Sequence, residues 1–232
     1  MSTKYQVVKQ NLSEKAVRNL KSRFLYLELK PGTRLIIEAL MKEMEISFTP
    51  VREALRELVK EGLVKYNGNS YTVVKYSPKE IEDIFAIRTS LEVLAVQLVS
   101  DKITQDLIDQ LKLCCYESEL AIENENYSRL TELDIKFHAT IAKAAGNTQL
   151  EQILNNIREK GWFIRRWVFG LRKYEESERK AIAEHNAVLK ELITGNAKGL
   201  ASSMQNHMEK AKERTSNALN EGYGSDKNTD NI

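Results

Sequence analysis

Apolar residues recur every three or four positions along most of the chain, which predicts helices separated by short turns. In the first third of the sequence this pattern predicts three helices. The first ends before the turn Lys30-Pro31-Gly32, the second covers Ile37–Met44, and the third stops at Glu61-Gly62. We place Thr49 as the cap of the third helix and Pro50 at its first position, where a missing N–H is tolerated.

A β-hairpin is predicted directly after these helices. Two β-rich runs, Leu63–Tyr66 and Tyr71–Val74, flank a strong turn signal that includes Asn67 and Gly68. Three helices followed by a hairpin is the order of a winged helix-turn-helix, in which the amino end of one helix lies in the DNA major groove. We expect the wing tip at Asn67-Gly68 to contact the DNA backbone or minor groove. The amino end of the third helix consists of Ser47, Phe48, Thr49 and Arg52.

Arg52 can act in two ways at this position. Its guanidinium matches the O6 and N7 atoms of guanine, and it also matches a phosphate. In isolation, Arg52 and Arg56 would be read as partners of Glu53 or Glu57 on a solvated helix. The surrounding winged-helix pattern favours DNA contact over that reading.

A domain boundary is predicted after Tyr76. The segment Ser77-Pro78-Lys79-Glu80 has the residues of a capping box with proline in the first turn, so a new helix starts there. We therefore expect a DNA-binding domain over residues 1–76 and a second domain over residues 77–220. The polar, glycine-containing tail over residues 221–232 is expected to be disordered.

The second domain has the pattern of six helices with short connections, which predicts an antiparallel all-α bundle. Thr148 and Glu151 are placed as a capping box at the start of the fourth helix, and a turn around Gly195 separates the last two. The fold class is thus mainly α. The first helix of this domain carries one expected apolar stripe, formed by Ile81, Ile84, Phe85, Ile87, Leu91 and Leu94.

Charge is distributed unevenly between the two domains. Residues 1–76 hold 14 Lys and Arg against 8 Glu, a net charge of +6, whereas residues 77–232 hold 21 against 25, a net charge of −4. This asymmetry indicates a nucleic-acid-binding segment joined to a segment with another task. The amino terminus lacks the apolar core of a signal peptide, and no uncharged stretch exceeds about ten residues, half of a membrane span. We therefore expect a cytoplasmic protein without membrane contact.

All three histidines lie in the second domain. Asp134 and His138 are four residues apart and share a helix face. His185 and His207 lie ten residues before and twelve after Gly195, so the helical hairpin brings them to nearly the same height. Three imidazoles and a carboxylate suit zinc, nickel, manganese or iron(II), and this ligand set does not select among them. As the cofactor we expect zinc, with the other three metals as alternatives. Ordinary half-buried histidines are the competing interpretation.

Residues 18–75 resemble the DNA-binding domain of GntR-type bacterial transcription factors. The resemblance rests on three motifs in order, at residues 29–35, 49–56 and 61–64. It implies that Arg34, Arg52 and the wing near Gly68 contact double-stranded operator DNA. The chain departs from the family at Phe48, where an arginine is usual; a phenyl ring can pack on a thymine methyl group but cannot hydrogen-bond a base.

From residue 77 to about 215 the chain resembles the FCD effector domain of the fatty-acid-regulator-like subfamily. The matching residues are Leu133–His138, Ala145–Asn147, Glu184-His185 and His207. This resemblance implies a metal at the floor of a small-molecule pocket, with a carboxylate effector completing the coordination. It makes Arg88 the candidate clamp for that carboxylate, while an ion pair with Glu92, one turn away, is the alternative.

The helix that holds Arg165 and Arg166 is interpreted as a core helix with both arginines at its rim. No Gly-rich phosphate loop, nucleophile elbow or His-Glu-x-x-His motif is present in the sequence. The expected function is a ligand-responsive transcription regulator that binds a two-fold operator as a homodimer. A mononuclear metal-dependent hydrolase and a regulator with a purely structural metal are the alternatives.

Overall fold

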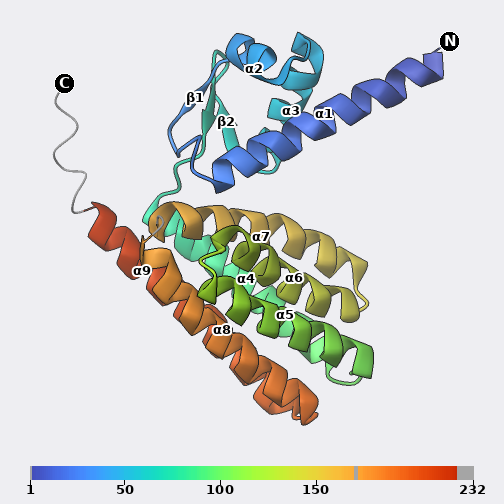
Figure 1. Ribbon diagram of the computed structural model, residues 1–232, viewed down its shortest axis with the longest axis vertical. Helices are drawn as coiled ribbons and strands as arrows, with labels where there is room; N and C mark the ends of the chain where they lie inside the picture. The colour runs from blue at the N-terminus through green and yellow to red at the C-terminus, as the bar shows by residue number, and fades with distance from the viewer. Residues whose placement is uncertain (1, 170–171, 224–232) are drawn as a thin grey trace. The chain divides into compact units, whose positions relative to one another are not determined.

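The computed structural model of the protein describes residues 2–169 and 172–223, and the chain divides into two units between Tyr76 and Ser77. Most of the described residues are helical, and Figure 1 shows the elements of each unit. The mainly-α fold class predicted from the sequence is therefore confirmed.

The first unit is a winged helix-turn-helix, as predicted. Its three strands form an antiparallel sheet in the order β1-β3-β2, with Arg34 opposite Thr72 and Val64 opposite Val73. The two-residue strand β1 was not predicted, because it is too short for an alternating pattern and exists through its pairing with β3. The elements are α1 (Ser2–Leu25), β1 (Arg34–Leu35), α2 (Ile37–Met44), α3 (Phe48–Lys60), β2 (Val64–Tyr66) and β3 (Tyr71–Val73).

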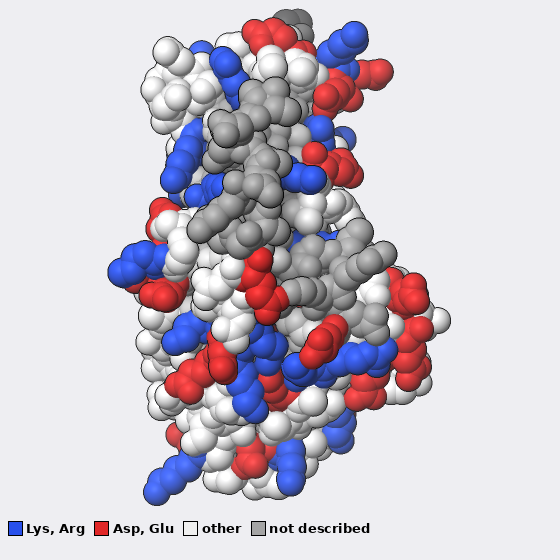
Figure 2. All heavy atoms as spheres, turned by 90° about the vertical axis from the view of Figure 1, so that its left-hand side faces the viewer, with Lys and Arg blue, Asp and Glu red and all other residues white. Residues whose placement is uncertain are grey.

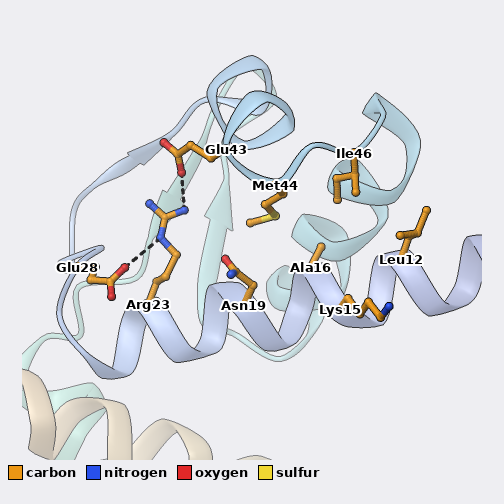
Figure 3. A pocket seen from close by; sticks show the side chains of 9 residues that line it. All are labelled: Leu12, Lys15, Ala16, Asn19, Arg23, Glu28, Glu43, Met44 and Ile46. Carbon is orange, nitrogen blue, oxygen red and sulfur yellow. Dashed lines mark hydrogen bonds and ion pairs between the residues drawn. The ribbon is translucent and has the colours of Figure 1, made fainter.

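Helix α1 packs on α3 and holds the unit together. Leu20 and Phe24 of α1 and Leu55 of α3 are among its fully buried side chains. Figure 3 shows Arg23 of α1 between Glu43, at 2.7 Å, and Glu28, at 3.5 Å, beside a groove of about 630 Å³. The pair with Glu43 ties α1 to α2, and the pair with Glu28 ties α1 to the turn that follows it.

Helix α3 begins earlier than predicted. Ser47 is its N-cap residue and Phe48 its first helical residue, so Thr49 lies in the first turn and is not the cap. A threonine followed by proline fits a cap and a first helical position, which made Thr49 look like the boundary. Pro50 is nevertheless accommodated, because N–H groups in the first turn have no partner within the helix. Phe48 is consequently held at the amino end of α3, with 44% of its surface exposed.

The second unit is the predicted bundle of six helices within its described residues. Helix α4 packs against α9 and α7, and α5 packs against α6 and α8. The capping box at its start is confirmed, since the Ser77 side chain accepts from the backbone N–H of Glu80 and the Glu80 side chain accepts from that of Ser77. The helices are α4 (Pro78–Val99), α5 (Gln105–Glu123), α6 (Tyr127–Ala144), α7 (Thr148–Phe169), α8 (Arg172–Ile193) and α9 (Ala197–Tyr223).

Two expected boundaries differ in the structure. Asn147 caps α7, since its Oδ1 accepts from the backbone N–H of Leu150 at 3.1 Å, and the predicted Thr148–Glu151 capping box is wrong. Thr148 is instead the first helical residue. Helix α9 continues through Tyr223, so the start of the expected tail is helical, and residues 224–232 lie outside the described residues.

The expected stripe of α4 consists of two faces. Ile81 and Phe85 are buried, whereas Ile87 is 52% and Leu94 is 39% exposed. The inward face continues from Ile81 and Phe85 to two charged residues, Arg88 and Glu92, which are also buried. Charged groups therefore occupy core positions, while apolar groups of the same helix face solvent.

No helix among the described residues is long and apolar enough to cross a bilayer. Figure 2 shows acidic and basic side chains interspersed over the face in view.

Candidate functional site

Three helices of the second unit bring the histidines together. His138 comes from α6, His185 from α8 and His207 from α9, and all three are buried. Each offers a ring nitrogen, and these three nitrogens lie within 4.8 Å of one another. The Nε2 atoms of His138 and His207 are 3.3 Å apart. The convergence expected from the hairpin at Gly195 is therefore present.

Asp134 lies beside this cluster but is not part of the compact histidine group. Its Oδ1 atom is 3.7 Å from Nε2 of His185, and its Oδ2 atom is 3.6 Å from Nη1 of Arg165. Both Asp134 Oδ1 and His185 Nε2 are buried without a hydrogen-bond partner. Buried polar atoms are nearly always satisfied in proteins, so the unmet hydrogen-bonding capacity of this pair is an exception that requires an explanation.

Two further carboxylates, not predicted as site residues, flank the histidines. Glu184 Oε2 is 2.9 Å from His207 Nδ1, and Glu92 Oε2 is 3.3 Å from His138 Nδ1. Glu184 and Glu92 thus face the ring nitrogens that point away from the centre of the cluster. Such carboxylate–histidine pairs typically orient metal-binding imidazoles.

An arginine grips each of these carboxylates with two parallel hydrogen bonds. Arg158 donates to Glu92 from Nε at 2.8 Å and from Nη2 at 3.2 Å, and Arg214 donates to Glu184 from Nη1 at 2.6 Å and from Nη2 at 2.9 Å. We call Arg158–Glu92–His138 the Glu92 triad and Arg214–Glu184–His207 the Glu184 triad. One sequence signal for the Glu92 triad existed, since Glu92 occupies a core position of α4 at helical spacing from Phe85 and Arg88.

Burial favours the neutral form of His185 and His207. It lowers the pKa of His207 to about 4, although the hydrogen bond to Glu184 acts in the opposite direction. Burial and the neighbouring histidines also keep the pKa of His185 well below its usual range. Burial would raise the pKa of Glu184, but the hydrogen bonds from His207 and Arg214 outweigh it and bring that pKa to about 2. Near neutral pH the site thus combines the neutral imidazoles of His185 and His207 with the ionised carboxylate of Glu184.

Arg88 is buried, and its Nε lies 3.4 Å from Glu92 Oε1, so the alternative ion pair is present. Gly161 of α7 lies beside it, and a Cβ atom at that position would be in van der Waals contact with Arg88 Nη1, at 3.4 Å. Arg165 and Arg166 are also buried, which corrects their expected place at the rim. Arg165 pairs with Glu178 and lies 3.6 Å from Asp134 inside the bundle.

The interior of the bundle carries more positive than negative groups. Among the residues whose side chains the structure describes, five arginines that are buried or nearly so face four such carboxylates. Burial raises the pKa of Glu178, one of these carboxylates, to about 7, which further reduces the negative charge. The arginines are Arg88, Arg158, Arg165, Arg166 and Arg214, and the carboxylates are Glu92, Asp134, Glu178 and Glu184.

The first unit has a concave face of about 730 Å³ that gathers part of the predicted DNA-contact set. Arg34, Phe48 and Arg52 line it, and the guanidinium carbon of Arg52 lies 5.8 Å from the centre of the Phe48 ring. This is within the range of a cation–π contact. The structure adds Arg56, Lys60, Tyr66 and Asn69 to this face.

The remaining predicted contacts lie at its edges. Ser47 is the exposed N-cap of α3, and Thr49 is half-buried. Asn67 shapes the wing turn, since its Oδ1 accepts from the backbone N–H groups of Asn69 at 3.1 Å and Ser70 at 2.9 Å. Gly68 has a φ of 94°, a conformation that favours glycine.

A winged helix with an exposed basic face, joined to a helical unit with a polar interior, defines a class of DNA-binding transcription regulators. Residues 12–74 match the family described as "Bacterial regulatory proteins, gntR family", and residues 83–210 match the FCD domain. The chain belongs to the GntR family of regulators with an FCD domain, which confirms the resemblance seen in the sequence.

Individual relatives support this assignment. The uncharacterized HTH-type transcriptional regulator YdhC of Bacillus subtilis is 28% identical over 83% of this chain and 86% of its own length. The gluconate operon transcriptional repressor of the same species is 25% identical over 60% of this chain and 57% of its own length. The structure of Escherichia coli McbR/YncC shares the fold, with a TM-score of 0.75 over 91% of this chain and 98% of that protein at 22% identity. These families and relatives are transcription regulators and not enzymes, which removes the hydrolase alternative.

Proposed function

We propose that the protein is a homodimeric, metal-containing transcription regulator whose operator binding responds to a small carboxylate. In this proposal residues 1–76 bind DNA and residues 77–220 hold the metal and the effector. The observation that carries it is the convergence of three buried imidazoles with unsatisfied Asp134 Oδ1 and His185 Nε2.

The hydrogen-bond pattern of the histidines favours a cation between them. A neutral imidazole carries one N–H group, and the hydrogen bond to Glu184 places it on Nδ1 in His207. In His138 the carboxylate of Glu92, 3.3 Å from Nδ1 without a hydrogen bond to it, favours the same tautomer. The two Nε2 lone pairs then face each other at 3.3 Å. Two nitrogens bound to one tetrahedral zinc are about 3.3 Å apart, so this separation fits a shared ion.

His138, His185 and His207 would hold the metal, with Asp134 as the fourth ligand. The ligand set of nitrogen and carboxylate oxygen suits zinc first, and nickel, manganese or iron(II) as alternatives. When bound, the metal supplies an electrophilic site for a carboxylate oxygen.

The charge balance supports an anionic effector. The interior already has more arginines than ionised carboxylates, and a divalent metal adds two positive charges. A carboxylate that binds the metal and Arg88 would neutralise part of this excess through a forked guanidinium contact. The related repressor named for the gluconate operon is consistent with this chemistry, since gluconate is a carboxylate.

The exposed face of α4 supports a dimer. Residues Ile84, Ile87, Leu91 and Leu94 are spaced alternately by three and four positions, the repeat by which two helices pack together. Ile87 and Leu94 are more than a third exposed. An effector alters operator affinity only if it favours one arrangement of the two DNA-binding units.

Elemental analysis of the purified protein tests the metal. We expect about one metal ion per chain in the wild type, none in His185→Ala, and an unchanged content in Cys115→Ala, a buried control. Equal metal content in the wild type and His185→Ala would contradict the assignment of the ligands.

Operator binding of the metal-loaded protein, on a site selected from random DNA, tests the effector. Small di- and tricarboxylates should change the affinity in the wild type and not in Arg88→Met. A protein that holds the metal but responds to none of them would support a purely structural metal. Sedimentation should show dimers, and Leu94→Arg should give monomers.

A further inference from the structure

The two triads differ in how far they lie from solvent. The side chains of Glu92 and Arg158 are 0% and 5% exposed, whereas those of Glu184 and Arg214 are 10% and 16% exposed. The Glu184–Arg214 pair lines an open groove of about 510 Å³ between α8 and α9. One side of the histidine cluster is therefore sealed inside the bundle, and the other is supported at the wall of a groove.

We propose that Glu184 is a positioning residue that holds His207 with its proton on Nδ1 and its Nε2 lone pair directed at the metal, and that Arg214 fixes Glu184 in this role. The inference rests on the proposed metal site and adds to it the residue pair that controls how tightly the metal is retained.

Geometry supports this role for Glu184. Its Oε2 atom accepts from His207 Nδ1 at 2.9 Å, the shortest contact between a carboxylate and a histidine among the described residues. Both oxygens of Glu184 are also bound by Arg214, so the carboxylate cannot rotate away without breaking two charge-assisted hydrogen bonds.

The alternative state of His207 is specific. Without Glu184, the proton can move to Nε2 and donate to Nε2 of His138, 3.3 Å away. Such a hydrogen bond would satisfy both rings and occupy the lone pair that a metal needs. Glu184 thus favours the metal-binding tautomer over a histidine–histidine hydrogen bond.

Glu184, His207 and Arg214 all lie on two helices, α8 and α9, close to one another along each helix. Glu184 directly precedes His185 on α8, and Arg214 follows His207 by seven residues, or two turns, on α9. The same pair of helices therefore supplies two metal ligands and the side chains that orient one of them.

The first test uses the metal-free protein. Long-range ¹H–¹⁵N spectra of the imidazole groups report which nitrogen of His207 carries the proton. We expect Nδ1–H in the wild type and a shift toward Nε2–H in Glu184→Ala. Glu184→Gln should keep part of the wild-type pattern, because its amide oxygen can still accept from Nδ1–H. Since the glutamine is nearly isosteric, it also provides a folded variant if the alanine variant fails to fold.

The second test is competition for zinc with a chromophoric chelator. Loss of an outer hydrogen-bond partner typically weakens metal binding 10- to 100-fold, and we expect this range for Glu184→Ala, with Arg214→Met weakened to a lesser extent. Glu213→Ala is the matched control, because Glu213 lines the same groove and has no recorded contact with His207.

The outcomes separate the two proposals. Wild-type tautomer and wild-type zinc affinity in Glu184→Ala would overturn the role of Glu184 while leaving the metal site intact. A wild-type protein that takes up no metal would refute the metal site. In that case the spectra of the metal-free protein still test whether Glu184 orients His207. A proton on Nε2 of His207 in the wild type would overturn this role.

Discussion

The two units use charge in opposite ways. In the first unit, the described buried side chains are apolar, and the charged groups of the concave face, such as Arg34 and Arg52, are exposed. In the second unit, Arg88, Glu92 and Asp134 occupy the core. An exposed charge remains hydrated and can follow the many phosphates of a polyanion, whereas a buried charge is held in one geometry that suits one small ligand.

As a consequence, an ion pair between the same residue types contributes differently to the free energy of unfolding in the two units. An exposed ion pair contributes about 0–1 kcal/mol. A buried pair costs several kcal/mol of desolvation and is often no better for stability than apolar residues. The buried charges of the helical unit are therefore best explained by a binding role, and this difference can be tested by removing one charge from each unit.

The largest effect is expected for Glu92→Ala. This change leaves Arg158 and Arg88 buried without their shared carboxylate, so the metal-free protein should lose about 3–5 kcal/mol of unfolding free energy. Urea unfolding followed by tryptophan fluorescence measures it, since both tryptophans, Trp162 and Trp167, lie in α7.

Glu57→Ala is the counterpart in the first unit. Glu57 pairs with Lys60 at 3.1 Å, and both side chains are at least half exposed. Its loss should change stability by less than about 0.5 kcal/mol, measured by circular dichroism. Similar losses in the two variants would break the contrast between the units.

The second effect is acid sensitivity of the helical unit in the absence of metal. His207 has a pKa of about 4 when folded and about 6.5 when unfolded, so the unfolded chain binds more protons between these values. The stability contribution of neutral His207 is complete above pH 6.5 and is lost as the pH falls, by about 3 kcal/mol at pH 4. Urea unfolding at several pH values, after treatment with a chelator, measures this loss.

His207→Asn removes one of two buried titrating imidazoles and should reduce this pH dependence, while the contribution of His185, whose pKa burial also holds well below its usual range, remains. The first unit contains no histidine, so its unfolding should change little over the same range. An identical pH profile for wild type and His207→Asn would show that His207 is not buried in the neutral form.

Much of the fold follows from sequence patterns that act locally. Helical periodicity, the Ser77 capping box and the turn at Gly195 each depend on neighbouring residues, and the structure confirms all three. The register of His185 and His207 followed from the same turn. The predicted start of α3 was wrong because proline was assigned to the first helical position. Pro50 is tolerated later in the first turn as well, since the N–H groups there have no partner within the helix.

The carboxylates and arginines around the histidine cluster could not be derived in this way. The contact between Glu184 and His207 depends on the packing of α8 against α9, and the contact of Arg158 with Glu92 depends on α7 against α4. The same limit explains why Arg165 was wrongly expected at the rim of the bundle. Its burial requires a partner from another helix, Glu178. Sequence spacing describes one helix, whereas these contacts depend on two.

The third effect concerns DNA affinity. Arg52→Ala should weaken binding to a selected operator by about 1–3 kcal/mol, or roughly 10- to 100-fold, with little change in thermal stability because Arg52 is exposed. Fluorescence anisotropy at constant salt measures it. Arg18→Ala is the control, since Arg18 is 65% exposed and pairs only weakly with Glu14 at 3.9 Å. Equal losses in both variants would mean that only net charge matters on this unit.

The smallest effect is expected for an apolar contact between the Phe48 ring and a base of the DNA. Phe48 replaces the arginine usual in the family, is 44% exposed, and lies beneath Arg52 on the concave face. If its ring packs on a thymine methyl group, replacing that thymine by deoxyuridine removes one methyl contact, which is worth about 0.8 kcal/mol or roughly four-fold in affinity.

This loss should occur at one thymine of each operator half-site and disappear in Phe48→Ala, which cannot make the contact. A loss that persists in Phe48→Ala would assign the methyl to another side chain, and no loss at any thymine would limit Phe48 to holding Arg52. The double comparison matters because Phe48→Ala alone also frees Arg52 and weakens binding for that reason. Only the difference between thymine and deoxyuridine isolates an apolar contact on a face whose other predicted contacts are charged or polar.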